Sequence, residues 1–324
     1  MMLIDDFGRR ITYLRLSVTD RCDLRCNYCM PEGFQSDEEP RDWLTFDELV
    51  RLAGLLATMG VERIRITGGE PLLRRNLPDL ARRLSSLPGV RDLSLSTNGT
   101  QLLKHAESLK QAGIGRLNVS LDSLDRARFQ AISRRDVLPE VLAGLEAARK
   151  VGFSQIKINM VVMPSTSEDE ANAMTAYCVE RGFILRLIET MPVGSAGQKA
   201  GFVDLRPWMQ RIRKRYGLID GIVSGGGPAR YLVSRDGGFQ IGFITALSQH
   251  FCETCNRIRL GANGSLHLCL GRNDSIDLRT LIRTGASDAS IMTTLKNSLK
   301  QKPFSHHFGQ QGHHVLRMMS STGG

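Results

Sequence analysis

Residues 13–31, YLRLSVTDRCDLRCNYCMP, join a strand-like segment to a loop that carries three cysteines. Apolar and polar residues alternate from Leu14 to Thr19, which is the side-chain period of a β-strand. Cys22, Cys26 and Cys29 follow directly, with the spacing CxxxCxxC. Parallel sheets and barrels carry their active sites at the carboxyl ends of their strands. The position of the cysteines therefore predicts a functional site at the end of the first strand.

Five further segments have the same short alternating pattern, with helical stretches between them. One helical stretch begins with a capping box, in which Thr45 and Glu48 precede apolar residues at helical spacing. Six strands that alternate with helices predict parallel βα units. The expected strands after the first begin at Arg63, Asp92, Arg116, Gln155 and Ile184.

These strands are polar on one face, although parallel strands covered by helices are normally apolar on both faces. A closed eight-stranded barrel fills its interior with apolar side chains. Six strands with a polar inner face therefore predict an α/β fold with an incomplete (βα)6 TIM-like barrel around a polar ligand. Arg15, Arg65 and Lys157 are expected to line its lumen. The alternative is an antiparallel sheet with one solvated face, which the intervening helices disfavour.

The chain is expected to have two parts. The alternating pattern ends near Glu189, and a second group of cysteines lies beyond Phe239. We expect residues 1–235 to form the partial barrel with a loop extension. Residues 236–324 are expected to form a C-terminal α+β lobe that ends in a tail of two glycines.

Composition narrows the range of partners. The formal net charge of the 324 residues is +10, which favours anionic partners such as nucleic acid, a membrane surface or a phosphorylated small molecule. No five consecutive residues are basic, and only 6% are aromatic, which argues against a stacking platform for nucleic acid. No run of 18 apolar residues and no signal peptide is evident, so we expect a cytoplasmic protein without a membrane span.

Seven cysteines divide into two groups of three and a single residue. In a reducing compartment such residues are metal ligands or buried small side chains more often than disulfides. The second group, Cys252, Cys255 and Cys269, has the spacing C-x2-C-x13-C. Cys178 stands alone in a helix-like stretch and is interpreted as a buried hydrophobic residue.

Two metal chemistries suit three closely spaced cysteines. A structural zinc site needs a fourth ligand, which His250 or His267 offers to the second group. After the first group the next histidine is His105, so a closed zinc site there needs a distant partner. An iron-sulfur cluster accepts three thiolates and leaves one iron open for a small molecule.

Several motifs make the resemblance to known enzymes specific. CxxxCxxC with Tyr28 before its last cysteine, together with GGEP at residues 68–71, resembles the radical S-adenosylmethionine superfamily. The segments STNGT, NVSLDSLD and CNRIRL and the final Gly323-Gly324 extend the resemblance over essentially the whole chain. With them the sequence is similar to the GTP 3',8-cyclase family of molybdenum cofactor biosynthesis.

This resemblance implies two 4Fe-4S clusters and S-adenosyl-L-methionine as cofactors. Cys22, Cys26 and Cys29 would hold the cluster that binds and reductively cleaves S-adenosylmethionine to a 5'-deoxyadenosyl radical. The second group would ligate another cluster, whose open iron binds the guanine end of GTP. The implied reaction forms (8S)-3',8-cyclo-7,8-dihydroguanosine 5'-triphosphate from GTP.

The resemblance also assigns individual residues by motif. Contacts to S-adenosylmethionine are implied for Tyr28, through its backbone, and for Gly69, Ser120 and Met191. Contacts to GTP are implied for Arg15, Arg65, Ser96, Lys157, Arg257, Ile258 and Arg259. The family often has threonine where this chain has Ser96, so either Ser96 or Thr97 is the hydroxyl donor. Arg15 and the two terminal glycines, Gly323 and Gly324, are implied to be catalytic.

Implied partners are a flavodoxin- or ferredoxin-like electron donor and a downstream cyclic pyranopterin monophosphate synthase, with a homodimer possible and no nucleic acid or membrane involved. The histidines near the C-terminus, at positions 306, 307, 313 and 314, are interpreted as part of the tail rather than as a metal-binding tract.

Two other functions remain as alternatives. One is a radical enzyme that modifies peptides and carries an auxiliary cluster, which should lack the Arg-x-Arg after Cys255 and the diglycine end. The other is a basic zinc- or cluster-binding protein that binds RNA and catalyses nothing.

Overall fold

The computed structural model describes residues 2–31, 33, 42–223, 226–308 and 314–323. All six strands expected from the sequence are present, and each pairs in parallel with its neighbours. The prediction of a parallel α/β fold is therefore confirmed. The first six strands are β1 (Tyr13–Ser17), β2 (Arg63–Thr67), β3 (Asp92–Thr97), β4 (Arg116–Ser120), β5 (Gln155–Val162) and β6 (Ile184–Glu189).

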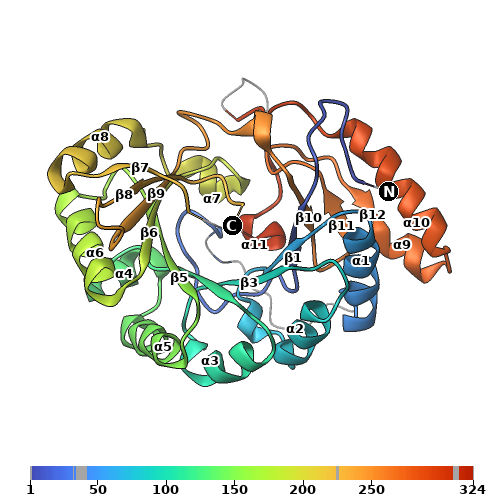
Figure 1. Cartoon of the computed structure of the whole chain (residues 1–324), viewed down its shortest axis with the longest axis horizontal. Helices are drawn as coiled ribbons and strands as arrows, with labels where there is room; N and C mark the ends of the chain where they lie inside the picture. The colour runs from blue at the N-terminus through green and yellow to red at the C-terminus, as the bar shows by residue number, and fades with distance from the viewer. Residues whose placement is uncertain (1, 32, 34–41, 224–225, 309–313, 324) are drawn as a thin grey trace.

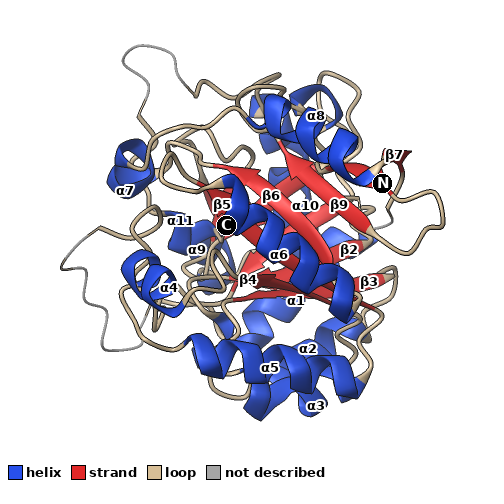
Figure 2. Cartoon of the chain, turned by 90° about the vertical axis from the view of Figure 1, so that its left-hand side faces the viewer, coloured by secondary structure: helices blue, strands red, loops and turns tan. Residues whose placement is uncertain are grey.

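Helices cover the outer side of the curved sheet (Figures 1 and 2). The helices of the described residues, including α11 inside the curved sheet (Figure 1), are α1 (Phe46–Thr58), α2 (Leu77–Ser85), α3 (Leu102–Gln111), α4 (Arg126–Ser133), α5 (Leu138–Val151), α6 (Glu168–Arg181), α7 (Gly194–Lys199), α8 (Leu205–Tyr216), α9 (Leu278–Arg283), α10 (Asp288–Ser298) and α11 (Met319–Thr322). The described residues also form the short 3-10 turns η1 (Pro71–Leu73), η2 (Cys252–Thr254) and η3 (Leu299–Gln301). No helix in the described ranges is long and apolar enough to cross a membrane.

The C-terminal third of the chain extends the same sheet at both edges. The strand order is β12-β11-β10-β1-β2-β3-β4-β5-β6-β9-β8-β7, and β10 and β9 lie parallel to β1 and β6. The expected boundary after residue 235 falls in the turn between β8 and β9, so strands from both expected parts share one sheet. The added strands are β7 (Ile219–Gly221), β8 (Arg230–Val233), β9 (Gln240–Ile244), β10 (Arg257–Leu260), β11 (Ser265–His267) and β12 (Ile276–Asp277).

The alternation along the strands separates a core face from an inner face. Leu14, Leu16, Ile64 and Ile66 are fully buried and belong to the main hydrophobic cluster. On the inner face, Arg15 of β1 lies in register with Arg65 of β2 on one side and with Arg259 of β10 on the other. Three guanidinium groups from neighbouring strands therefore share the interior of the curved sheet.

Local signals determine where the helices begin and end. The predicted capping box is present: the Thr45 hydroxyl accepts a hydrogen bond from the Glu48 amide, and the Glu48 carboxylate accepts one from the Thr45 amide. Glu48 also binds Arg283 of α9, which joins α1 to the C-terminal part of the chain. Gly152 ends α5 with a φ of 79°, a conformation that glycine adopts without strain.

We expect Thr45→Ala to lower the free energy of unfolding by about 1 kcal/mol, because it removes the hydroxyl that caps α1. Urea denaturation of the iron-free chain, followed by circular dichroism, measures the change. Thr293→Ala in the exposed middle of α10 is the control and should leave stability unchanged or slightly higher. Equal losses in both variants would contradict this role of the cap.

Candidate active site

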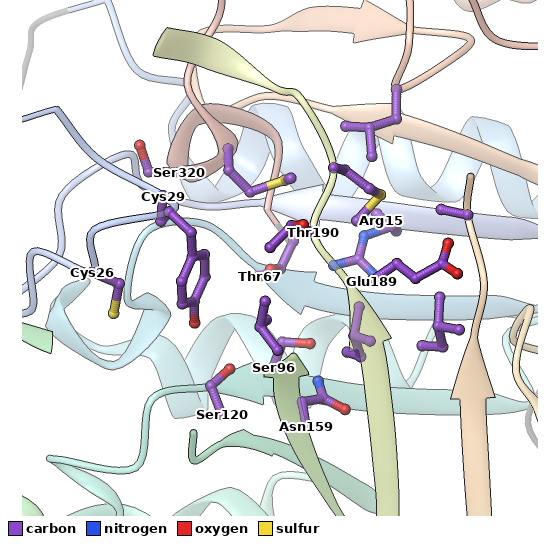
Figure 3. A pocket seen from close by; sticks show the side chains of 18 of the residues that line it. Arg15, Cys26, Cys29, Thr67, Ser96, Ser120, Asn159, Glu189, Thr190 and Ser320 are labelled. Carbon is purple, nitrogen blue, oxygen red and sulfur yellow. The ribbon is translucent and has the colours of Figure 1, made fainter. Parts of the chain in front are cut away.

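A single cavity inside the curved sheet contains both groups of cysteines among its lining residues. Its volume of about 280 Å³ has room for roughly twenty water molecules, enough for ligands of cofactor and nucleotide size. Figure 3 shows Cys26 and Cys29 on one side and Arg15, Ser96, Ser120 and Asn159 around the same space. The two cysteine groups thus face one shared cavity rather than two separate sites.

The register of β10 on β1 places the two cysteine groups at opposite ends of neighbouring strands. Cys22 follows the last residue of β1, at its carboxyl end. Cys255 lies two residues before Arg257, which pairs with Tyr13 at the amino end of β1. A ligand in the cavity can therefore contact one cysteine group at each end.

The first cysteine loop is held by backbone pairing with the GGEP segment. The Gly69 amide donates to the Thr19 carbonyl at 2.9 Å, and the Glu70 amide donates to the Arg21 carbonyl at 2.7 Å. A Cβ on Gly69 would lie only 2.2 Å from the Arg21 carbonyl oxygen. Glycine is required at this position because the loop leading to Cys22 passes directly over it.

The surroundings of the first group are acidic. Burial raises the pKa values of Cys22, Cys26 and Cys29, to about 12 for Cys29, and the nearby carboxylates Glu70 and Asp122 raise them further. Burial also raises the pKa of Glu70 to about 8 and that of Asp122 to about 6. Thiols in this setting ionise readily only when a cation, such as the iron of a cluster, stabilises them.

Two contacts bind the first loop to the ends of the neighbouring strands. The Tyr28 hydroxyl donates to Asp122 at 2.7 Å, and Asp122 also accepts from the Val161 amide of β5. The Asn98 amide group, in the STNGT segment, donates to Asp23 at 2.7 Å and lies 3.6 Å from the Cys22 sulfur. The loop is therefore positioned by β3, β4 and β5 as well as by β2.

The second group has basic surroundings. Burial opposes ionisation of Cys255, but Arg257 and Lys302 outweigh it and lower the pKa of this thiol to about 7. The Lys302 ammonium lies 3.8 Å from the Cys255 sulfur. Burial raises the pKa of the Cys252 thiol, and the neighbouring Cys269 and Cys255 raise it further.

Two arginines hold the backbone of the other two cysteines in this group. Arg9 donates to the Cys252 carbonyl at 2.8 Å and is paired with Asp5. Arg317 donates to the Cys269 carbonyl at 3.1 Å. Each of the three cysteines of the second group is thus contacted, at its sulfur or its backbone carbonyl, by a cationic side chain.

Buried arginines fill the middle of the cavity. Burial and the neighbouring Arg259 and Arg65 lower the pKa of Arg15 well below its usual value. Burial and Arg257 lower the pKa of Arg259 to about 9. A bound anion would relieve the repulsion between these guanidinium groups. A polyphosphate suits this role, because its oxygens can accept the paired N–H donors of each arginine.

The structure distinguishes the two candidate hydroxyls on β3. Thr97 donates to Glu70 at 2.8 Å and accepts from the Gly99 amide, so its hydroxyl is already engaged. The Ser96 hydroxyl lines the cavity, is shielded from solvent and has no hydrogen-bond partner in the described structure. Ser96 is therefore the hydroxyl available to a ligand.

The C-terminal tail enters the site. Helix α11 lies in the interior of the curved sheet (Figure 1), and Met319 and Ser320 line the cavity. The Gly323 carbonyl accepts a hydrogen bond from Arg259 at 3.0 Å. Gly323 has a φ of 71°, and a Cβ there would lie 2.3 Å from the Thr67 side chain. Gly324 lies outside the described residues.

Most of the residues assigned from the sequence line the cavity, but among the described residues Lys157, Ile258 and Gly323 do not. Lys157 is buried near the start of β5, where its ammonium lies 3.4 Å from the Tyr231 hydroxyl. Ile258 places its side chain in the hydrophobic core, on the face of β10 opposite to Arg257 and Arg259. The assigned residues that do line the cavity are Arg15, Tyr28, Arg65, Gly69, Ser96, Ser120, Met191, Arg257, Arg259 and all six cysteines.

Arg186 of β6 also lines the cavity and was not singled out from the sequence. It donates to Asn159 at 2.8 Å and to Asn118 at 2.5 Å, so its charge is met by amide oxygens rather than by a carboxylate. Burial lowers its pKa to about 10. The sequence contains a pattern that could have identified Arg186: the alternation in ILRLIE, residues 184–189, places it on the polar face of the strand.

Cys178 and the C-terminal histidines are other residues singled out from the sequence, and of these His306 lines the cavity. Cys178 is fully buried in the core, as predicted. His306 contacts the Ala246 carbonyl at 2.8 Å, and His307 lies 2.7 Å from the Arg272 guanidinium. His313 lies outside the described residues. No three His, Cys, Asp or Glu side chains in the described ranges gather closely enough to hold a single metal ion.

Comparisons with known proteins cover the whole chain. The model of the Radical SAM superfamily matches residues 16–178, and that of Molybdenum Cofactor Synthesis C matches residues 183–308. The GTP 3',8-cyclase of Ectopseudomonas mendocina is 46% identical, over 99% of this chain and 98% of that protein. The GTP 3',8-cyclase of Hydrogenovibrio crunogenus is 44% identical over the full length of both.

A similar fold occurs in a solved structure, that of Streptococcus suis SuiB bound to S-adenosylmethionine. It aligns with a TM-score of 0.66 over 91% of this chain and 69% of that chain. The sequence identity is 15%, so the likeness concerns the fold alone.

The contrast in thiol pKa predicts selective alkylation of the iron-free protein. At pH 7 about half of the Cys255 thiols should be ionised and almost none of the Cys29 thiols, so iodoacetamide should modify Cys255 at least tenfold faster. Peptide mass spectrometry over time measures both rates. Arg257→Gln should slow the reaction at Cys255, because it removes the cation that lowers this pKa. Buried Cys178 is the unreactive control, and equal rates at Cys255 and Cys29 would contradict the analysis.

Proposed function

Because this chain belongs to the GTP 3',8-cyclase family of radical S-adenosylmethionine enzymes, we propose that it converts GTP into (8S)-3',8-cyclo-7,8-dihydroguanosine 5'-triphosphate. This is the first step of molybdenum cofactor biosynthesis. The observation that carries the proposal is one cavity with a cysteine group at each end and buried arginines between them.

The residues present fit the cofactors of this reaction. Three thiols in each group suit an iron-sulfur cluster, and three thiolates would leave one iron of each cluster without a protein ligand from the group. The hydroxyls of Ser96 and Ser320 are buried without a hydrogen-bond partner in the described structure, and both line the cavity. Such orphaned groups are expected where a polar ligand completes the site.

The first cysteine group, Cys22, Cys26 and Cys29, would hold the cluster that binds S-adenosylmethionine. Gly69, Ser120, Met191 and the backbone at Tyr28 would hold the S-adenosylmethionine, and all four residues line the cavity close to that group's end of the strands. When bound, the reduced cluster and S-adenosylmethionine supply the carbon radical that removes hydrogen from the ribose of GTP. The protein's contribution is to position the ribose and to exclude water.

The arginines would hold the triphosphate. Arg15, Arg65 and Arg259 lie in register on adjacent strands, so their forked donors can bind several phosphate oxygens together. Arg186 extends this set from β6, and Ser96 adds a hydroxyl. Lys157 does not line the cavity, and burial and the neighbouring Arg186 lower its pKa to about 7. Bound phosphates would favour its charged form and so add to the positive charge of the site.

The second cysteine group, Cys252, Cys255 and Cys269, would hold the auxiliary cluster at the other end of the cavity, where the guanine would bind. In this arrangement Arg257 lies between the thiols and the arginine set. Ile258 would contribute only through its backbone, because its side chain is in the core.

The division of the chain follows from these roles. Residues 1–235 would form the partial (βα)6 barrel that binds S-adenosylmethionine, and residues 236–324 would supply the auxiliary cluster and the tail. A flavodoxin- or ferredoxin-like donor would reduce the protein, and a cyclic pyranopterin monophosphate synthase would take its product. We place these steps in the cytoplasm, and a homodimer is compatible with them.

The first test is 5'-deoxyadenosine formation by anaerobically reconstituted, reduced protein with S-adenosylmethionine and either GTP, ATP or no nucleotide. We expect formation that GTP stimulates, together with a cyclised guanine product detected by mass spectrometry. Formation without nucleotide preference would overturn GTP as the substrate. No formation by protein with full iron content would overturn the radical reaction.

Gly323→Ala should lower the rate of product formation at least tenfold, because a methyl group there would overlap Thr67 and displace the tail from Arg259. Deletion of Gly323 and Gly324 should have the same effect while both clusters are retained. Gly285→Ala is the matched control, since Gly285 has a similar φ of 81° but nothing within 4 Å of the added Cβ. Normal product formation by Gly323→Ala would show that the tail has no part in the reaction.

A further inference from the structure

Lys302 is a buried lysine outside the set of residues that line the cavity. It follows η3, and only 3% of its surface is exposed. A buried ammonium group must have all three of its N–H donors satisfied. Its partners are the Cys255 sulfur at 3.8 Å, the Arg257 carbonyl at 2.9 Å and the Leu268 carbonyl.

These three acceptors come from the two segments that carry cysteines of the second group. Arg257 lies two residues after Cys255, and Leu268 directly precedes Cys269. The ammonium group therefore joins the loop before β10 to the loop after β11. The antiparallel pairing of β10 with β11 places these two segments side by side, and the Lys302 ammonium group adds a contact between them beside their cysteines.

The charge of Lys302 is compensated by those cysteines. Burial, together with Arg9 and Arg257, lowers the pKa of Lys302, whereas Cys255 and Cys269 oppose this shift and favour the ammonium form. A lysine buried among two arginines is stable only beside an anion. Two thiolates, or the cluster that they ligate, supply that anion.

We propose that Lys302 is a positioning residue for the auxiliary cluster: its ammonium group fixes the segments of Cys255 and Cys269 relative to each other and raises the reduction potential of the cluster. This proposal rests on the second cluster included in the proposed function. The physical reason is that reduction adds negative charge, which a cation and a hydrogen bond at a ligating sulfur stabilise.

The test isolates the auxiliary cluster by replacing Cys22, Cys26 and Cys29 with alanine in the full chain. Lys302→Met and Lys302→Gln remove the charge, and Gln keeps an N–H donor. Lys302→Arg keeps the charge. Lys300→Met changes an exposed lysine on the same segment and is the matched control. Iron content and the midpoint potential, from a redox titration followed by electron paramagnetic resonance, are measured for each variant.

We expect a lower potential in both neutral variants, by about the 59 mV that corresponds to a tenfold change in a one-electron equilibrium. Lys302→Arg and Lys300→Met should remain near the parent value. Loss of iron in both neutral variants, with full iron in Lys302→Arg, would also support the proposal, because the charge would then hold the site together.

An unchanged potential in Lys302→Met or Lys302→Gln with full iron would overturn the role of the charge. Loss of iron in all three Lys302 variants would overturn it as well, since packing rather than charge would then be the requirement. Absence of any cluster in the parent with the three alanines would instead contradict the second cluster of the proposed function, so the two failures are distinguishable.

Discussion

The site depends on the parallel pairing of β10 with the free edge of β1. This pairing brings a strand from the last quarter of the chain beside the first strand, in a register that sets Arg259 next to Arg15. It also determines where the cysteines lie, because the first group follows the carboxyl end of β1, while Cys252 and Cys255 precede the amino end of β10. The cavity between them, and the arginines that fill it, follow from that one edge contact.

The two ends of the cavity differ in electrostatics. Carboxylates surround the first cysteine group, and the cations Arg9, Lys302 and Arg317 surround the second. At the first group, the Asp122 carboxylate would make a cluster harder to reduce and hence a stronger reductant, which suits cleavage of a sulfonium. Under the proposed function, the positive surroundings of the second group would favour a cluster that binds an electron-rich ligand. The two ends would then differ in role although both held the same type of cofactor.

Short-range patterns in the sequence predicted much of this arrangement, and long-range contacts were beyond them. Alternation gave the six strands and the inward direction of Arg15 and Arg65, because the side-chain period of a strand is local. Alternation does not show how far along a strand the cavity extends. Lys157 is therefore expected at the cavity from its face of β5, but it lies nearer the start of the strand, beside Tyr231. Nothing local distinguishes Lys302 from a surface lysine, since its burial depends on segments that precede it by more than 30 residues. The sequence also does not predict that β9 and β10 extend the sheet. Pairing between strands that are distant in sequence produces no periodic pattern of residues.

The sharing of one sheet has a consequence for how the molecule can be divided. The C-terminal segment has no sheet of its own, since β10 and β9 complete the edges of β1 and β6. A fragment that stopped at residue 235 would carry unpaired backbone groups along both β1 and β6. Open parallel edges of this kind pair with other chains. The barrel part is therefore not a separable module, and expression of it alone should give aggregates rather than a simpler enzyme.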